Sequence, residues 1–242
     1  MLAILLMTAV GGFSFNVNVL SDRSKTIHGV PAGERAEWKE HIEAIVPSDP
    51  RDADLARLLL GQARAFARDY YAGDTGDASG SFEATDTAGS LDVFETLEAA
   101  SSDLVSVHVG ASYYEASMAH PNSDASLNIV WSRRLHRPLT QADVLSIAPD
   151  RALKLKALAA FDNQEGIDAS QFTDGLPLDW KHATVGPAGI SWTFGPYELG
   201  GYASGGSATV SWASLAPYLR RPLPFSIAKL RAPADTKPSE AR

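Results

Sequence analysis

Residues 105–114 read Val-Ser-Val-His-Val-Gly-Ala-Ser-Tyr-Tyr, and this stretch decides the fold class. Apolar and polar side chains alternate along it, which is the period of a strand with one buried face. The loop 119–124 follows, and the alternation then resumes with Leu127, Ile129 and Trp131. Two alternating runs joined by a loop predict an antiparallel hairpin, and His108 faces its polar side as a surface or interface residue.

The segments around this hairpin give strands and helices in no regular alternation. Strands are expected at 13–19, 82–97, 190–194 and 208–212, and helices at 32–46, from Asp49 onward, at 140–144, at 150–161 and at 214–219. The first helix rests on the spacing of Trp38, Ile42 and Ile45. Residues 162–187 read as irregular, and the chain after Pro222 as frayed. This order predicts an α+β fold: antiparallel sheets with helices packed on them, in two intimately associated subdomains.

Composition excludes several classes of protein. The chain has 242 residues, a formal net charge of -8 and no cysteine. Disulfides, thiolate zinc sites and cysteine nucleophiles are therefore ruled out. The acidic balance has the wrong sign for a surface that follows phosphates, so nucleic acid is not an expected partner.

The first ten residues form an apolar run that is too short to cross a bilayer. Its length suits the core of a secretory signal, and we interpret residues 1–12 as the remnant of one, with a mature N-terminus near Gly12. A buried first strand is the alternative. No transmembrane span is expected elsewhere in the chain.

Two loops hold the candidate ligand-binding residues. The stretch 195–206 combines five glycines with Tyr197 and Tyr202, which suits either recognition of a partner or a structural connection. Glu198 lies between the tyrosines, and the loop 119–124 contributes His120 and Asn122. A loop-fixing hydrogen bond is the other role open to His120. No pair of histidines has the spacing of metal ligands, so we expect no metal. The sequence also has no Gly-x-Ser-x-Gly motif and no Walker-type loop, so we expect no cofactor and no catalytic residue.

Several short motifs carry a resemblance to a known family. They are 105–114, Ala119-His-Pro-Asn122, Leu139-Thr140 with Asp143, and Trp192-Thr-Phe-Gly-Pro-Tyr-Glu-Leu199. In this order they resemble the extracellular domain of the anti-sigma factor RsiV, a domain pair that also accompanies PdaC-type peptidoglycan deacetylases.

The resemblance implies a division of the chain. Residues 13–118 would form a PdaC-like N-terminal subdomain, 119–220 an RsiV-like C-terminal subdomain and 221–242 a flexible tail. Neither a sigma-binding segment nor a deacetylase domain is recognisable. The resemblance therefore implies a non-catalytic, periplasmic or secreted domain that binds a lysozyme-like protein or peptidoglycan. A cell-wall hydrolase or deacetylase with an unrecognised site is the alternative, and the oligomeric state stays open.

Overall fold

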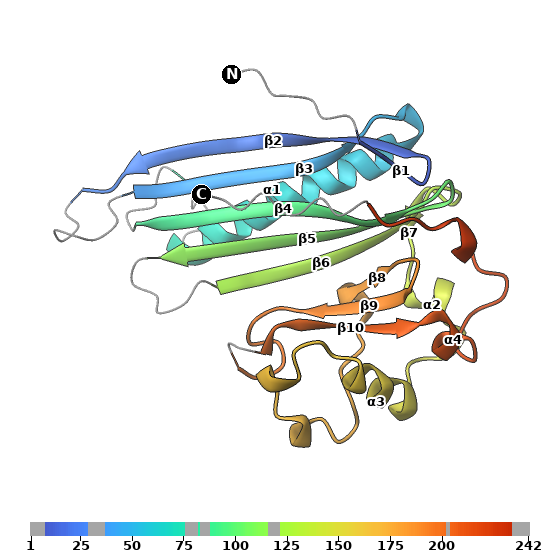
Figure 1. The fold of residues 1–242 in the computed structure, drawn as a ribbon. Helices are drawn as coiled ribbons and strands as arrows, with labels where there is room; N and C mark the ends of the chain where they lie inside the picture. Colours follow the sequence, from blue (N-terminus) through green and yellow to red (C-terminus); the bar gives the residue numbers. More distant parts are fainter. Residues whose placement is uncertain are drawn as a thin grey trace.

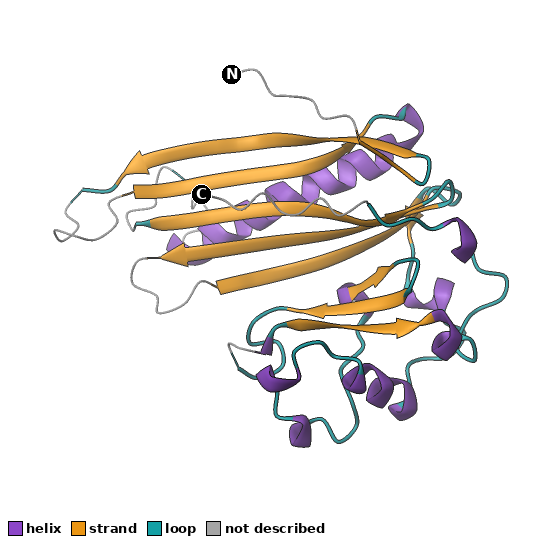
Figure 2. Ribbon diagram, in the orientation of Figure 1, coloured by secondary structure: helices purple, strands orange, loops and turns teal. Residues whose placement is uncertain are grey.

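The computed structural model describes residues 8–28, 37–75, 82, 88–115, 122–201 and 204–233. These residues form two sheets (Figures 1 and 2). The large sheet has seven strands in sequence order: β1 (Thr8–Val10), β2 (Phe13–Thr26), β3 (Glu37–Pro47), β4 (Gly89–Ala100), β5 (Leu104–Glu115), β6 (Asn122–Ser132) and β7 (Arg137–Pro138). The small sheet has the order β10 (Gly206–Ser211), β9 (Gly189–Phe194) and β8 (Ala183–Val185). The α+β fold class is thereby confirmed.

One long helix covers a single face of the large sheet. A short 3-10 turn, η1 (Pro50–Asp52), leads into α1 (Ala53–Thr75), and Asp49 caps the turn by accepting a hydrogen bond from the backbone of Arg51. The apolar side of α1 is buried on the sheet through Leu55, Leu59, Ala63, Ala67 and Tyr71. The connection β3–α1–β4 is a parallel crossover, whereas the other neighbours in both sheets pair antiparallel.

The hairpin predicted from 105–114 is present as β5 and β6. Val105, Val107 and Val109 are fully buried under α1, and they pair with β6 in antiparallel register. Because successive side chains point to opposite faces, Ser106, His108 and Gly110 lie on the face turned away from α1. The polar side expected for His108 is therefore confirmed, and its side chain is half-buried there.

The expected helix at 32–46 is wrong where the structure describes it. Residues 37–47 form strand β3, in which Trp38, Glu40, Ile42 and Ala44 are buried in alternation. Trp38 and Ile42 are four residues apart, a spacing that puts both on one side of either a helix or a strand. The buried Glu40 between them distinguishes the two, because it shares their face only in a strand.

The small subdomain, residues 139–230, packs against one end of the large sheet. It holds the small sheet, α2 (Gln141–Val144), α3 (Arg151–Ala159), α4 (Trp212–Leu215) and 3-10 turns, among them η4 (Trp180–His182). Its core is centred on Trp192, Ile190 and Leu153. Thr140 and Asp143 form the predicted capping box of α2, and Asp150 caps α3 as expected.

Three features of this half differ from the expectations. β8 lies within the stretch expected to be irregular, and the boundary expected at 118–119 falls between two paired strands of the large sheet. The chain after Pro222 is also docked as far as the structure describes it: Phe225 and Leu230 are buried, and Arg231 exchanges two backbone hydrogen bonds with Ala100, of 2.9 and 3.0 Å. The segment after Pro222 therefore packs its apolar side chains in the small subdomain and pairs with β4 of the large sheet, so it connects the two. Within the described ranges, no helix has the length and apolar character to cross a bilayer.

Candidate ligand-binding face

The face of the large sheet opposite α1 is polar, and we call it the polar face. Strand register places Asp22, His41, Asp92 and Ser112 side by side in one row across β2, β3, β4 and β5. The neighbouring row is Ser24, Lys39, Ser90 and Tyr114. Directly paired residues have adjacent side chains on the same face, so each row is a continuous polar strip.

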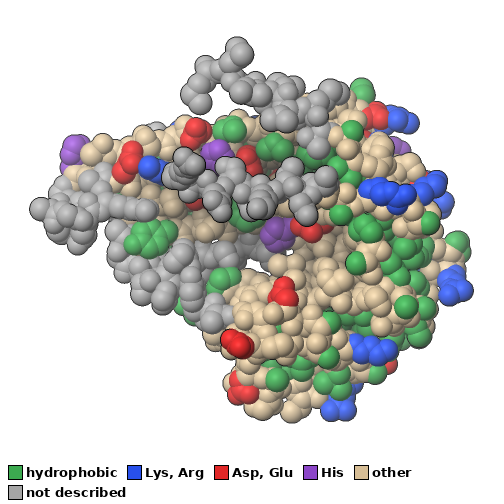
Figure 3. All heavy atoms as spheres, viewed as in Figure 1, with side chains coloured by type: hydrophobic (Ala, Val, Ile, Leu, Met, Phe, Trp, Pro, Cys, Tyr) green, Lys and Arg blue, Asp and Glu red, His purple; other side chains and the backbone are tan. Residues whose placement is uncertain are grey.

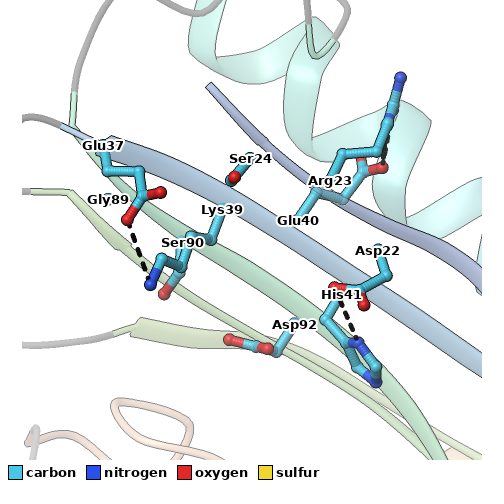
Figure 4. Close-up of a pocket in the computed structure, with 10 residues that line it drawn as sticks. All are labelled: Asp22, Arg23, Ser24, Glu37, Lys39, Glu40, His41, Gly89, Ser90 and Asp92. Atoms are coloured by element: carbon cyan, nitrogen blue, oxygen red, sulfur yellow. Dashed lines mark hydrogen bonds and ion pairs between the residues drawn. The ribbon is translucent and has the colours of Figure 1, made fainter. Parts of the chain in front are cut away.

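A hollow of about 820 Å³ lies at this end of the sheet (Figure 4). Within it His41 stands between two carboxylates: Nδ1 is 3.8 Å from Oδ1 of Asp22, and Nε2 is 3.6 Å from Oε2 of Glu43. Lys39 is 3.2 Å from Glu37. Since Glu37 offsets the charge of Lys39, the carboxylates around His41 leave this strip acidic.

Partial desolvation acts on two carboxyl groups of the polar face. Burial between the neighbouring strands raises the pKa of Asp92, while His41 and a hydrogen bond from Ser90 oppose the shift. Burial also raises the pKa of Glu98, and His108 opposes it. A cationic group brought against these carboxylates would favour their charged forms.

The hollow is backed by a buried network that fixes its strands on α1. Glu40 is only 1% exposed, and its Oε1 accepts hydrogen bonds from Nε and Nη2 of Arg23 at 2.8 and 2.6 Å, and one from Ser21. Its Oε2 accepts from the hydroxyl of Tyr71 on α1 at 2.6 Å. Burial, with the bond to Glu40, raises the pKa of Tyr71 above its ordinary range. The hydrogen bonds of Glu40 with Arg23 and Tyr71 therefore connect the strands that line the hollow, β2 and β3, to α1.

Of the residues predicted to bind a ligand, Tyr197 and Glu198 lie together in the turn between β9 and β10. Tyr197 is 53% exposed and has a φ of 66°, and its backbone N–H donates to the carbonyl of Gly201 at 2.9 Å. Oε2 of Glu198 accepts from the backbone N–H of Gly195 at 2.7 Å and lies 3.7 Å from Nδ1 of His182. Burial lowers the pKa of His182, and Glu198 opposes that shift. Glu198 thus anchors the turn that presents Tyr197.

The side chains of the other three predicted site residues lie outside the described part of the structure. His120 and Tyr202 lie outside the described residues. Asn122 begins β6, where its backbone is in register with Tyr113. Their expected role in binding stays a prediction.

No pattern in the sequence indicated the residues that line the hollow. Asp22, His41 and Asp92 belong to no motif, and they come together only through strand register. One signal was present: once 37–47 is read as a strand, the polar residues Lys39 and His41 alternate with buried ones. In the ranges that the structure describes, no three His, Asp or Glu side chains gather as metal ligands would.

Comparisons with known proteins bear on the fold. No family model matches the sequence, and no curated protein matches it. Two crystal structures of similar fold come from proteins of the DUF3298 family, a domain of unknown function. The Bacteroides fragilis protein is 11% identical, with a TM-score of 0.56 over 88% of this chain and 96% of its own. The Pseudomonas aeruginosa protein is 12% identical, with a TM-score of 0.57 over 86% of this chain and 95% of its own. At such identities the likeness concerns the fold alone, and in its fold this chain is similar to proteins of the DUF3298 family.

Proposed function

We propose that the protein is a non-catalytic binding domain of the bacterial cell envelope, periplasmic or secreted, whose polar face binds a basic, lysozyme-like protein or peptidoglycan. The envelope and these two ligands come from the resemblance to RsiV and PdaC-type proteins. The observation that carries the proposal for this molecule is the row Asp22–His41–Asp92 beside the hollow of about 820 Å³.

The chemistry of the row suits a basic protein. An arginine of a partner binds a carboxylate through two parallel hydrogen bonds, and Asp22 and Asp92 flank His41 on an uncovered part of the sheet. The net charge of -8 would also speed the encounter with a basic partner, so the association rate should fall as salt is added. The dissociation rate should depend mainly on the contacts themselves.

The β9–β10 turn supplies a second candidate contact. Tyr197 offers a large exposed ring on a turn fixed by Glu198, and an aromatic side chain of this kind gives contact area at low entropic cost. Replacing Tyr197 with Ala should raise the dissociation rate and leave the melting temperature unchanged. A fall in the melting temperature without any change in binding would assign Tyr197 to the fold alone.

A matched pair of double variants tests the proposal. The variant Asp22→Asn/Asp92→Asn neutralises the row, and Asp69→Asn/Asp174→Asn removes the same charge from exposed positions on α1 and in the small subdomain. Binding to a basic lysozyme and to soluble peptidoglycan fragments is measured by biolayer interferometry over a salt series. The first variant should bind at least about tenfold more weakly, and the second within about threefold of the unmodified protein.

Two results would contradict the proposal. Equal losses in the two double variants would show only unspecific attraction by net charge. If neither ligand binds at about 50 µM, both are excluded as ligands of this protein, because even weak specific recognition gives measurable occupancy at that concentration. Release of sugar or acetate from peptidoglycan in the same samples would favour a hydrolase or deacetylase.

A further inference from the structure

A second cluster of polar side chains lies on the polar face, closer to the small subdomain than the hollow described above. Thr96, His108 and Asn128 form one row across β4, β5 and β6. Phe94 and Gly110 form the adjacent row. Figure 3 shows the surface hollowed where the small subdomain meets this face, with a histidine and an acidic side chain at the wall of the hollow.

The imidazole of His108 is held in one orientation by Asn128. Nδ1 of His108 lies 2.7 Å from Oδ1 of Asn128, which can only accept. This contact selects the tautomer with the proton on Nδ1, in which Nε2 is left as an acceptor. Asn128 is 8% exposed, and its Nδ2 has no hydrogen-bond partner among the described residues. An unpaired buried donor costs roughly 1 to 3 kcal/mol, which a purely structural strand pair would avoid. We therefore interpret Asn128 as a residue that orients the imidazole of His108 rather than one that stabilises the fold.

Phe94 provides an apolar surface beside His108. The two ring centroids are 6.1 Å apart, and both side chains are half-buried. Gly110 lies beneath them: a Cβ atom there would come within 2.6 Å of the Phe94 ring and 3.1 Å of Nε2 of His108. The glycine thus allows the aromatic ring and the imidazole to lie together on the sheet.

A carboxylate completes the cluster through an irregularity in β4. The register between β4 and β5 shifts between Leu97 and Ala99, so Glu98 occupies a bulge. Bulges redirect a side chain from the regular pleat, and they are over-represented next to functional sites. Glu98 is half-buried, and His108 is near enough to oppose the rise in the pKa of Glu98 that burial causes.

From this arrangement we infer that Phe94, His108 and Glu98 form a carbohydrate-binding subsite that takes one pyranose ring of an envelope glycan. A pyranose presents C–H groups on its face, which suit the negative face of an aromatic ring, and hydroxyls at its edge. One hydroxyl would donate to Nε2 of His108 and a second to the carboxylate of Glu98. Asn128 is a positioning residue that fixes the tautomer of His108. The inference deepens the proposed function by naming the sugar ring as the recognised group, and it rests on the polar face being the binding face.

The inference is tested by NMR titration of the full chain, labelled with ¹⁵N. One sample is titrated with chitotriose, the trimer of N-acetylglucosamine, and a second with cellotriose. Amide shifts should change at Phe94, Gly110 and Asn128. Phe94→Leu and His108→Ala should each weaken binding by about tenfold or more, and His108→Gln, which keeps an acceptor, should weaken it less than His108→Ala. The variant Asp69→Asn/Asp174→Asn, which changes exposed positions away from the polar face, is the control, and it should bind the trimer within about twofold of the unmodified protein.

The outcomes separate this inference from the proposed function. No shift with either trimer at about 10 mM would overturn the subsite, and lysozyme binding by the same sample would leave the proposed function intact. Sugar binding that is lost in the Asp22/Asp92 variant but kept in His108→Ala would also overturn the subsite. If His108→Ala does not fold, Phe94→Leu and the position of the amide shifts decide the matter.

Discussion

We expect Glu95 to make the stability of the protein depend on pH. Its side chain, on β4, is 5% exposed, and its Oε2 accepts a hydrogen bond from the backbone N–H of Ile45 on β3 at 2.7 Å. Oε1 has no hydrogen-bond partner among the described residues. Burial raises the pKa of Glu95 from 4.5 to about 7, the nearby Glu43 adds to the shift, and the bond from Ile45 opposes it.

The direction of the effect follows from proton linkage. A carboxyl whose pKa is raised by folding stays protonated in the native state while the unfolded chain has already lost the proton. Its stabilisation is complete below 4.5 and is lost as the pH rises through about 7. The difference between these two values corresponds to roughly 3 kcal/mol of unfolding free energy.

Glu95→Gln removes this dependence because glutamine keeps the acceptor for Ile45 and carries no charge. In urea unfolding the free energy of the variant, relative to the unmodified protein, should rise by roughly 3 kcal/mol between about pH 4 and about pH 8.5. Glu165→Gln, at an exposed position, serves as the control and should show almost no such trend. A relative change below about 1 kcal/mol in Glu95→Gln, or a fall in its relative stability toward high pH, would refute the reasoning.

Four further predictions concern the fold, the metal content and the N-terminus. Arg133 is 10% exposed and donates hydrogen bonds of 2.7 and 2.9 Å to the carboxylate of Asp52, which is 2% exposed. Arg133→Ala should therefore lower the free energy of urea unfolding by about 3 to 5 kcal/mol, because it leaves a buried charge unpaired. Arg57→Ala, at an exposed position, should lower it by less than about 0.5 kcal/mol. Phe225→Ala should cost about 3 kcal/mol by the same measurement because the segment after Pro222 is docked; no loss of stability would contradict that docking. Elemental analysis after mild dialysis should find no stoichiometric zinc, and one equivalent would instead support a deacetylase. The sequence predicts a mature N-terminus near Gly12, which would remove β1, although β1 pairs with β2 in the structure and Val10 is buried. Intact mass of the protein from its native host decides between the two, and an uncleaved chain would favour β1 as part of the mature fold.

Local sequence patterns predicted the elements whose signals are short-range. The hairpin β5–β6 follows from strict alternation, and the caps of α2 and α3 follow from Thr140, Asp143 and Asp150. β3 could not be distinguished from a helix, because its buried Glu40 looks like a surface residue until its partners on β2 and α1 are known. The strand conformation of β3 depends on partners far away in the sequence, and a local pattern does not reveal them.

The candidate site depends still more on such pairing. Asp22, His41 and Asp92 are separated by 19 and 51 residues in the chain and become neighbours only through the order β2–β3–β4. That order includes the parallel crossover through α1, which no local pattern indicates. The β9–β10 turn was predictable because its glycines and tyrosines are contiguous in the sequence.

Ligand binding on the polar face is tested most directly by amide shift mapping. The full chain, labelled with ¹⁵N, is titrated with a basic lysozyme and separately with soluble peptidoglycan fragments. For at least one ligand, we expect the shifts to concentrate at 22–24, 39–41, 90–92 and 108–112, and the outer side of α1 to be unaffected. Shifts confined to α1, or to the β9–β10 turn without the polar face, would contradict this expectation.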